Sequence, residues 1–213
     1  FEAVAALRAH LKHTSVAPVI CVPCGNFGNL TAGILAQRLG LPVKKFIAAT
    51  NANDVVPVFL GGSAYQPRPS VATLANAMDV GAPNNWERIV HLYRKNDAWL
   101  RSDLAFGSMT DPEIRTTIRH LHGLGLLSEP HSAIAYGVLK QHLQPAPPAF
   151  PLFANTPGVF LSTAHPAKFK EIVEEELHLP LLLPHALAEV ADKPLLSKMI
   201  SPDVTGLKKH LSA

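Results

Sequence analysis

The sequence predicts an α/β fold with three layers, in which a mostly parallel, twisted sheet has helices on both of its faces. A β-branched run at residues 17–22 ends in a glycine turn and is followed at once by a helix-forming segment, residues 30–39. A second apolar strand follows at residues 42–49, and this order is that of a right-handed, parallel strand–helix–strand unit. With 213 residues, 47% hydrophobic and 16% charged, the chain can bury a core.

The first segment, residues 1–12, is predicted as the last turns of a helix, because no start signal precedes it. This fits a chain cut from a longer one. Between residues 61 and 70 the composition turns to Gly, Ser, Gln and Pro, which is typical of an exposed connection.

Two helices in the middle of the chain have capping signals. Asn84 or Asn85 is expected to cap the first, which extends to about residue 95. Its predicted apolar stripe is Trp86, Ile89, Val90 and Tyr93. The second opens with Asp111 as the cap and Pro112 at the first helical position, and is expected to end near Gly123.

The last third of the chain is predicted to continue the same domain. A short strand at residues 126–129 leads into a helix from Pro130 to about residue 142, and a proline-rich surface loop covers residues 145–157. A strand at residues 158–162 then precedes a turn and a helix that ends near Leu177. We therefore expect one α/β domain over residues 1–180, with a helical extension, residues 181–213, packed on it.

Charge and composition exclude several classes of function. The net charge is only +3 and its basic residues are dispersed, which argues weakly for an anionic ligand and against nucleic acid as a partner. No apolar run is long enough to span a membrane, and nothing resembles a signal peptide. A cytoplasmic protein is expected, with no nucleic-acid or membrane partner.

The cysteines and histidines do not predict a metal site. Cys21 and Cys24 have the spacing of a redox pair or of half a zinc site, but no second pair of thiols exists. Cys21 also falls inside the predicted strand, where a buried free thiol is usual. The eleven histidines show no i, i+4 pairing. His131 is among them, and none is assigned a catalytic role.

The turn between the first strand and its helix carries the strongest chemical signal. It contains Gly25, Asn26, Phe27, Gly28 and Asn29. A glycine turn at a helix N-terminus leaves backbone N–H groups free to bind an anion such as a phosphate, and Asn29 is expected to cap the helix. The pattern is neither a P-loop nor a dinucleotide fingerprint, so an ordinary strand-to-helix turn remains the alternative.

Three stretches together resemble one enzyme family. Residues 25–33, GNFGNLTAG, resemble the phosphate-binding loop of threonine synthase, a pyridoxal-phosphate (PLP) enzyme of the tryptophan synthase β-subunit type. Residues 48–57, AATNANDVVP, and 163–169, TAHPAKF, match the same family in the same order. The resemblance covers nearly the whole chain, places it in the C-terminal half of the enzyme and implies part of a PLP fold-type II large domain.

The resemblance implies roles for individual residues. The cofactor-binding residues would be Gly25 to Asn29 at the coenzyme phosphate and Thr163 at the pyridine nitrogen. The catalytic residue would be absent, because the family's Schiff-base lysine lies ahead of the phosphate loop. Lys44, Lys45 and Lys168 do not match that position and are predicted as solvated surface residues. No metal ligand is implied.

Four further residues are candidates for lining the site, and three of them have a structural alternative. Glu129 is either close to the cofactor ring or an acid at a helix N-terminus. Asn51 and Asn53 either face the site or form an Asx-turn before the next helix. His165 adjoins Thr163, whose own alternative is an ordinary helix cap.

The activity implied by the resemblance is a lyase reaction of threonine biosynthesis. It would convert O-phosphohomoserine and water to threonine and phosphate with PLP, and this chain alone would be inactive. Two alternatives remain open: a related PLP phospho-lyase with another phosphorylated substrate, and a non-catalytic anion-binding domain. The exposed cofactor face is expected to be apolar and concave, which favours self-association.

Overall fold

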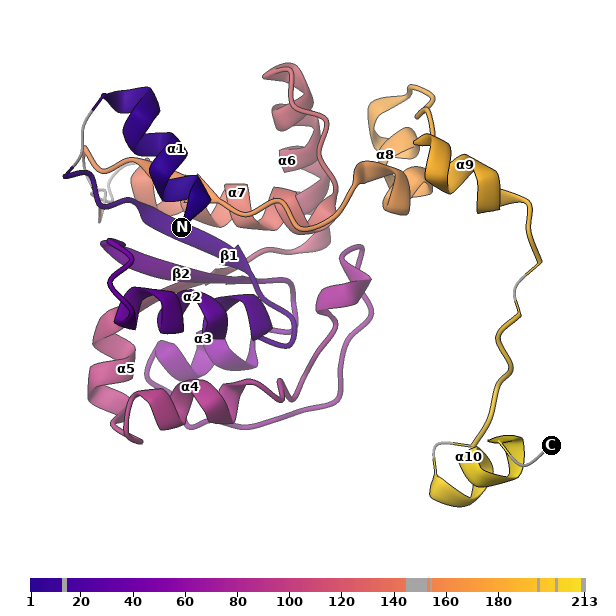
Figure 1. The fold of residues 1–213 in the computed structure, drawn as a ribbon, viewed down its shortest axis with the longest axis horizontal. Helices are drawn as coiled ribbons and strands as arrows, with labels where there is room; N and C mark the ends of the chain where they lie inside the picture. Colours follow the sequence, from indigo (N-terminus) through magenta and orange to yellow (C-terminus); the bar gives the residue numbers. More distant parts are fainter. Residues whose placement is uncertain (13–14, 145–152, 154, 195, 202, 212–213) are drawn as a thin grey trace. The chain divides into compact units, whose positions relative to one another are not determined.

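The described residues form one sheet of four parallel strands. The computed structural model describes residues 1–12, 15–144, 153, 155–194, 196–201 and 203–211. Within them the strand order is β3-β2-β1-β4 (Figure 1). The strands are β1 (Val19–Pro23), β2 (Lys45–Thr50), β3 (Leu104–Ser108) and β4 (Gly158–Phe160), and each pairs in parallel with its neighbour. The predicted parallel sheet is confirmed.

Helices cover both faces of this sheet, because alternate residues of the central strands point to opposite sides. On one face, Ile20 and Phe46 belong to a core that also includes side chains of α2 (Gly28–Arg38), α3 (Val55–Leu60), α4 (Trp86–Leu92) and α5 (Asp97–Asp103). On the other face, Cys21 and Ile47 pack with side chains of α6 (Asp111–Gly123) and α7 (Pro130–Leu143). Figure 1 shows α2 to α5 on one side of the sheet and α6 and α7 on the other. The predicted three-layer arrangement is therefore confirmed.

The remaining elements before residue 182 are the N-terminal helix, two short 3₁₀ turns and the helix after β4. The predicted N-terminal helix is α1 (Glu2–Leu11), and the segment after β4 forms a 3₁₀ turn followed by α8 (Lys170–Leu177). The two 3₁₀ turns are η1 (Asn76–Met78) and η2 (Pro166–Phe169). The proline-rich loop predicted at residues 145–157 falls largely on residues 145–152 and 154, which lie outside the described residues.

One predicted strand and two predicted helix caps differ from the structure. Residues 126–129 form no strand; Leu126 N–H bonds the Leu121 carbonyl and closes the end of α6, and this leucine is 43% exposed. The cap of α6 is Thr110, whose hydroxyl and N–H both bond Glu113, instead of Asp111. Asn29 does not cap α2, since the helix begins one residue earlier, at Gly28.

The chain divides into two compact units, residues 1–181 and residues 182–213. The second contains α9 (His185–Ala191) and α10 (Val204–Leu211), and neither helix has a buried residue. The packing of this extension on the first unit stays a prediction. Among the described residues, no helix combines the length and the apolar character needed to cross a bilayer.

Candidate cofactor site

The turn after β1 contains a run of backbone N–H groups that find no acceptor in the described part of the chain. Cys24 N–H bonds the Ala49 carbonyl and Thr31 N–H bonds the Phe27 carbonyl. Between them, the N–H groups of residues 25–30 donate to no described residue. Because α2 begins at Gly28, its unpaired amides and its dipole favour an anion at this point.

The turn approaches η1 so closely that Gly25 has no room for a side chain. A Cβ at this position would lie 2.8 Å from both the Ala77 carbonyl oxygen and the Met78 Cα. Gly28 differs, since a Cβ there would meet only Asn85 Nδ2, at 3.7 Å. The first glycine is therefore required by packing, whereas the second leaves the mouth of the turn open.

Phe27 adopts an unusual backbone conformation at the start of α2. Its φ is 60°, in the left-handed region that non-glycine residues seldom occupy. The side chain is 3% exposed, and its ring makes an edge contact with Trp86 at a centroid distance of 5.7 Å. Packing against α4 therefore fixes the turn.

A cavity of about 220 Å³ lies over the turn. All the predicted cofactor-binding residues line it, together with His131; they are Gly25, Asn26, Phe27, Gly28, Asn29 and Thr163. The Thr163 hydroxyl makes no hydrogen bond within the described part of the chain. The carboxyl end of β1 and the turn after β4 thus meet at one concave site, as expected for a parallel sheet.

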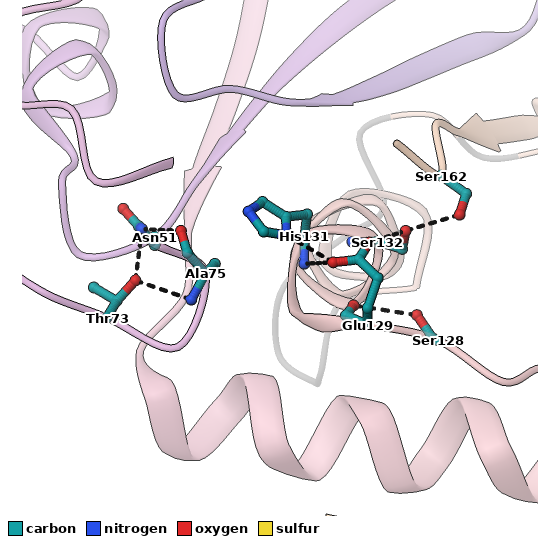
Figure 2. Close-up of polar contacts among 8 residues, drawn as sticks. All are labelled: Asn51, Thr73, Ala75, Ser128, Glu129, His131, Ser132 and Ser162. Atoms are coloured by element: carbon teal, nitrogen blue, oxygen red, sulfur yellow. Dashed lines mark hydrogen bonds and ion pairs between the residues drawn. The ribbon is translucent and has the colours of Figure 1, made fainter. Parts of the chain in front are cut away.

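Glu129 holds His131, which lines this cavity, and Figure 2 shows the contacts between the two residues. The fully buried carboxylate caps α7 and accepts hydrogen bonds from the backbone and side chain of both His131 and Ser132. Burial alone raises the pKa of Glu129, but the bonds from His131 and Ser132 outweigh it, and the pKa lies below its ordinary value of 4.5. The group is ionised at neutral pH.

Known proteins are similar to this chain in both sequence and fold. Residues 132–211 match the family described as threonine synthase, C-terminal. Threonine synthase from Serratia marcescens is 50% identical over 211 residues, which are 99% of this chain and 46% of that protein. The crystal structure of threonine synthase from Escherichia coli has a TM-score of 0.81 at 49% identity, covering 91% of this chain and 43% of that one. The chain belongs to the threonine synthase family.

The chain spans about half the length of the threonine synthases that it matches. A PLP-bound threonine synthase from Brucella melitensis has a TM-score of 0.79 at 27% identity, covering 98% of this chain and 48% of that one. These similarities confirm the predicted family and the C-terminal portion, and they confirm the fold-type II architecture.

Asn51 and Asn53 do not line the cavity over the glycine turn. Asn51 Nδ2 donates to Thr73 Oγ1 at 2.8 Å and to Asp79 Oδ1 at 2.7 Å, and Asn53 Nδ2 reaches the same carboxylate at 3.1 Å (Figure 2 shows Asn51 and Thr73). Asn53 N–H bonds Asn51 Oδ1, which is the Asx-turn alternative. The amides fasten the segment at residues 71–79 to the end of β2.

His165 and the lysines also lie elsewhere. His165 caps η2 by accepting a bond from Ala167 N–H, so His165 takes the capping role considered for Thr163. Lys44 Nζ donates to Thr156 Oγ1 and Lys45 Nζ to the Ser102 carbonyl, both at exposed positions. Lys168 is exposed and does not line the cavity.

A larger cavity, about 970 Å³, lies on the face of α4 and α5. Its lining includes Phe59, Tyr65 and Trp86, and it shares no residue with the cavity over the glycine turn. Size alone would favour it as the site. The free amides and the predicted cofactor-binding residues instead converge on the smaller cavity, which is therefore the candidate site.

Two asparagine substitutions separate a structural role from a binding role. Asn51→Ala is expected to lower the free energy of unfolding by about 1–3 kcal/mol, because it removes buried hydrogen bonds and leaves Asp79 with fewer donors. Asn29→Ala is the matched control, because Asn29 is exposed and has no side-chain bond to the described residues. Urea titrations that showed equal stability losses for the two variants would contradict this assignment.

Proposed function

We propose that this chain supplies the part of a threonine synthase that holds the phosphate and the ring nitrogen of PLP. In the complete enzyme, we propose, the activity is conversion of O-phosphohomoserine and water to threonine and phosphate. The observation that carries the proposal is the convergence of the glycine turn and Thr163 on one cavity. Family membership supports the reaction, and the PLP-bound relative supports the cofactor.

The residues present fit the coenzyme. Its phosphate dianion matches the free N–H groups of residues 25–30 at the start of α2. Gly25 keeps that wall free of side chains, and the buried Nε2 of His131 lacks a partner among the described residues. Each feature is one that an anionic ligand would complete.

Thr163 is proposed to set the electronic character of the site. PLP supplies an electron sink for charge that develops next to the substrate amine. A neutral hydroxyl at the ring nitrogen does not hold that nitrogen protonated as an aspartate would. The Thr163 side chain therefore tempers the sink, which favours elimination and replacement chemistry over transamination.

The lysine that carries the coenzyme is proposed to come from the remainder of the enzyme. Within the described residues, no lysine lines the cavity. The ligands of the substrate phosphate are assigned to the same remainder, because the cavity walls, as far as the structure describes them, contain no arginine or lysine to bind a second phosphate. We expect this chain by itself to be inactive.

Assay of the full-length gene product tests the proposal. With PLP and O-phosphohomoserine, threonine and phosphate are expected in equal amounts. Release of a ketoacid without threonine would indicate a related lyase instead. A native product of about 23 kDa that bound no PLP would contradict an enzyme altogether and favour an anion-binding domain.

Thr163 offers a substitution that tests its own role in this assay. Thr163→Val is expected to lower the turnover number about tenfold, because it removes one hydrogen bond at the ring nitrogen. Thr163→Ser keeps the hydroxyl and is expected to retain most of the activity. Equal turnover by the valine variant and the native enzyme would contradict the assignment.

A further inference from the structure

A buried ring nitrogen without a protein partner lies in the wall of the glycine-turn cavity. His131 is 4% exposed, and its Nε2 bonds none of the residues that the structure describes. The same side chain lines the cavity with the glycine turn and Thr163. A buried polar atom left without a partner costs about 1–3 kcal/mol, so such atoms are usually satisfied by a ligand or water.

The imidazole is held firmly in this position. Its Nδ1 lies 2.7 Å from Glu129 Oε2, and the ring of Phe169 packs against it at a centroid distance of 4.7 Å. Ser132 N–H bonds the other carboxylate oxygen at 2.7 Å, so Glu129 cannot turn away. In Figure 2 the ring projects from the start of α7, with its outer nitrogen at the end away from the helix.

The bond to Glu129 determines which proton the ring offers to the cavity. An ionised carboxylate only accepts hydrogen bonds, so Nδ1 carries a proton and donates it. An anion at Nε2 requires a proton there as well, and the resulting positive ring is balanced by Glu129. Among the described residues that line the cavity, His131 is the one ionisable side chain. The remaining donors there are neutral amides and a hydroxyl.

We propose that His131 binds an anionic oxygen of the coenzyme phosphate through its Nε2–H, with Glu129 as the residue that positions the ring. This inference rests on the proposed function, since it concerns the same cavity. It adds to the backbone amides a side-chain donor from a segment about a hundred residues further along the chain. The phosphate would then be bound by groups at the start of both α2 and α7.

Two isosteric substitutions test the role of Nε2. His131→Asn places an amide where Nδ1 lies, so the bond to Glu129 can remain while the reach into the cavity is lost. His131→Gln places an amide near Nε2 and keeps a neutral donor. His142→Gln is the matched control, because His142 Nε2 already donates to the Phe106 carbonyl at 2.9 Å.

The measurements are PLP affinity and the ³¹P resonance of the bound coenzyme, made on the full-length gene product. The asparagine variant is expected to bind PLP about tenfold more weakly or worse, with a displaced resonance, and the glutamine variant to fall between it and the native protein. Unchanged affinity and an unmoved resonance in the asparagine variant would overturn the role of His131 and leave the proposed function standing. Failure of the native protein to bind PLP would overturn both.

Discussion

Gly25→Ala is expected to abolish PLP binding and to lower the free energy of unfolding by about 1–3 kcal/mol. The new Cβ would lie 2.8 Å from two backbone atoms of η1, and backbone cannot rotate away as a side chain can. The turn and η1 must therefore separate, which moves the free amides from their positions around the phosphate. Equilibrium dialysis with PLP and a urea titration measure the two effects.

Gly28→Ala provides the matched control in the same turn. Its Cβ would meet only the Asn85 side-chain amide at 3.7 Å, which is ordinary van der Waals contact. Stability is expected to stay the same or to rise slightly, because alanine favours helix over glycine. A Gly25→Ala variant as stable as Gly28→Ala would show that the approach to η1 is not required.

Glu129→Gln is expected to lower the free energy of unfolding by about 3 kcal/mol at pH 7. The amide nitrogen that replaces one carboxylate oxygen would face N–H and O–H donors from His131 or Ser132, in a fully buried site. The helix cap of α7 is weakened by the same change. Thermal or urea unfolding measures the loss, and Glu175→Gln, at an exposed acid, is the control.

The free energy of unfolding of Glu129→Gln is expected to depend less on pH in the acid range than that of the native protein. The folded-state pKa of Glu129 is below 4.5, so its contribution to stability is complete above that value. The contribution disappears as the pH falls through the lower, folded-state pKa, because the unfolded chain then binds more protons. A plot of stability against pH should therefore fall less steeply below pH 4.5 in Glu129→Gln; parallel curves would contradict the assignment.

The first half of the sheet was predictable because its signals are local. The run before Gly25 is apolar on every residue, and a strand buried on both faces requires this. By contrast, β3 was missed: Leu104–Ser108 is short, contains a glycine and follows α5 without a turn signal. Its pairing with β2 joins residues that are far apart in the sequence, and no local pattern predicts such a pairing.

The residues of the candidate site also divide into those that the local sequence predicts and those that only the fold identifies. The glycine turn and Thr163 were predicted from their flanking residues, although their convergence on one cavity required the fold. Asn51 looked equally polar and well placed, but its partners are Thr73 and Asp79, more than twenty residues away. His131 was given no role, because the one available signal, an acid two residues earlier at a helix start, is equally typical of a simple cap.

The backbone of Phe27 has a consequence for how a ligand is bound. Its left-handed conformation is unfavourable for a residue with a side chain, and the contact with Trp86, which lies within the protein itself, helps to maintain it. The turn is thus preorganised: the entropy of ordering its amides is lost when the protein folds rather than when the anion arrives. Affinity at this loop therefore originates partly in the packing of an aromatic side chain against α4.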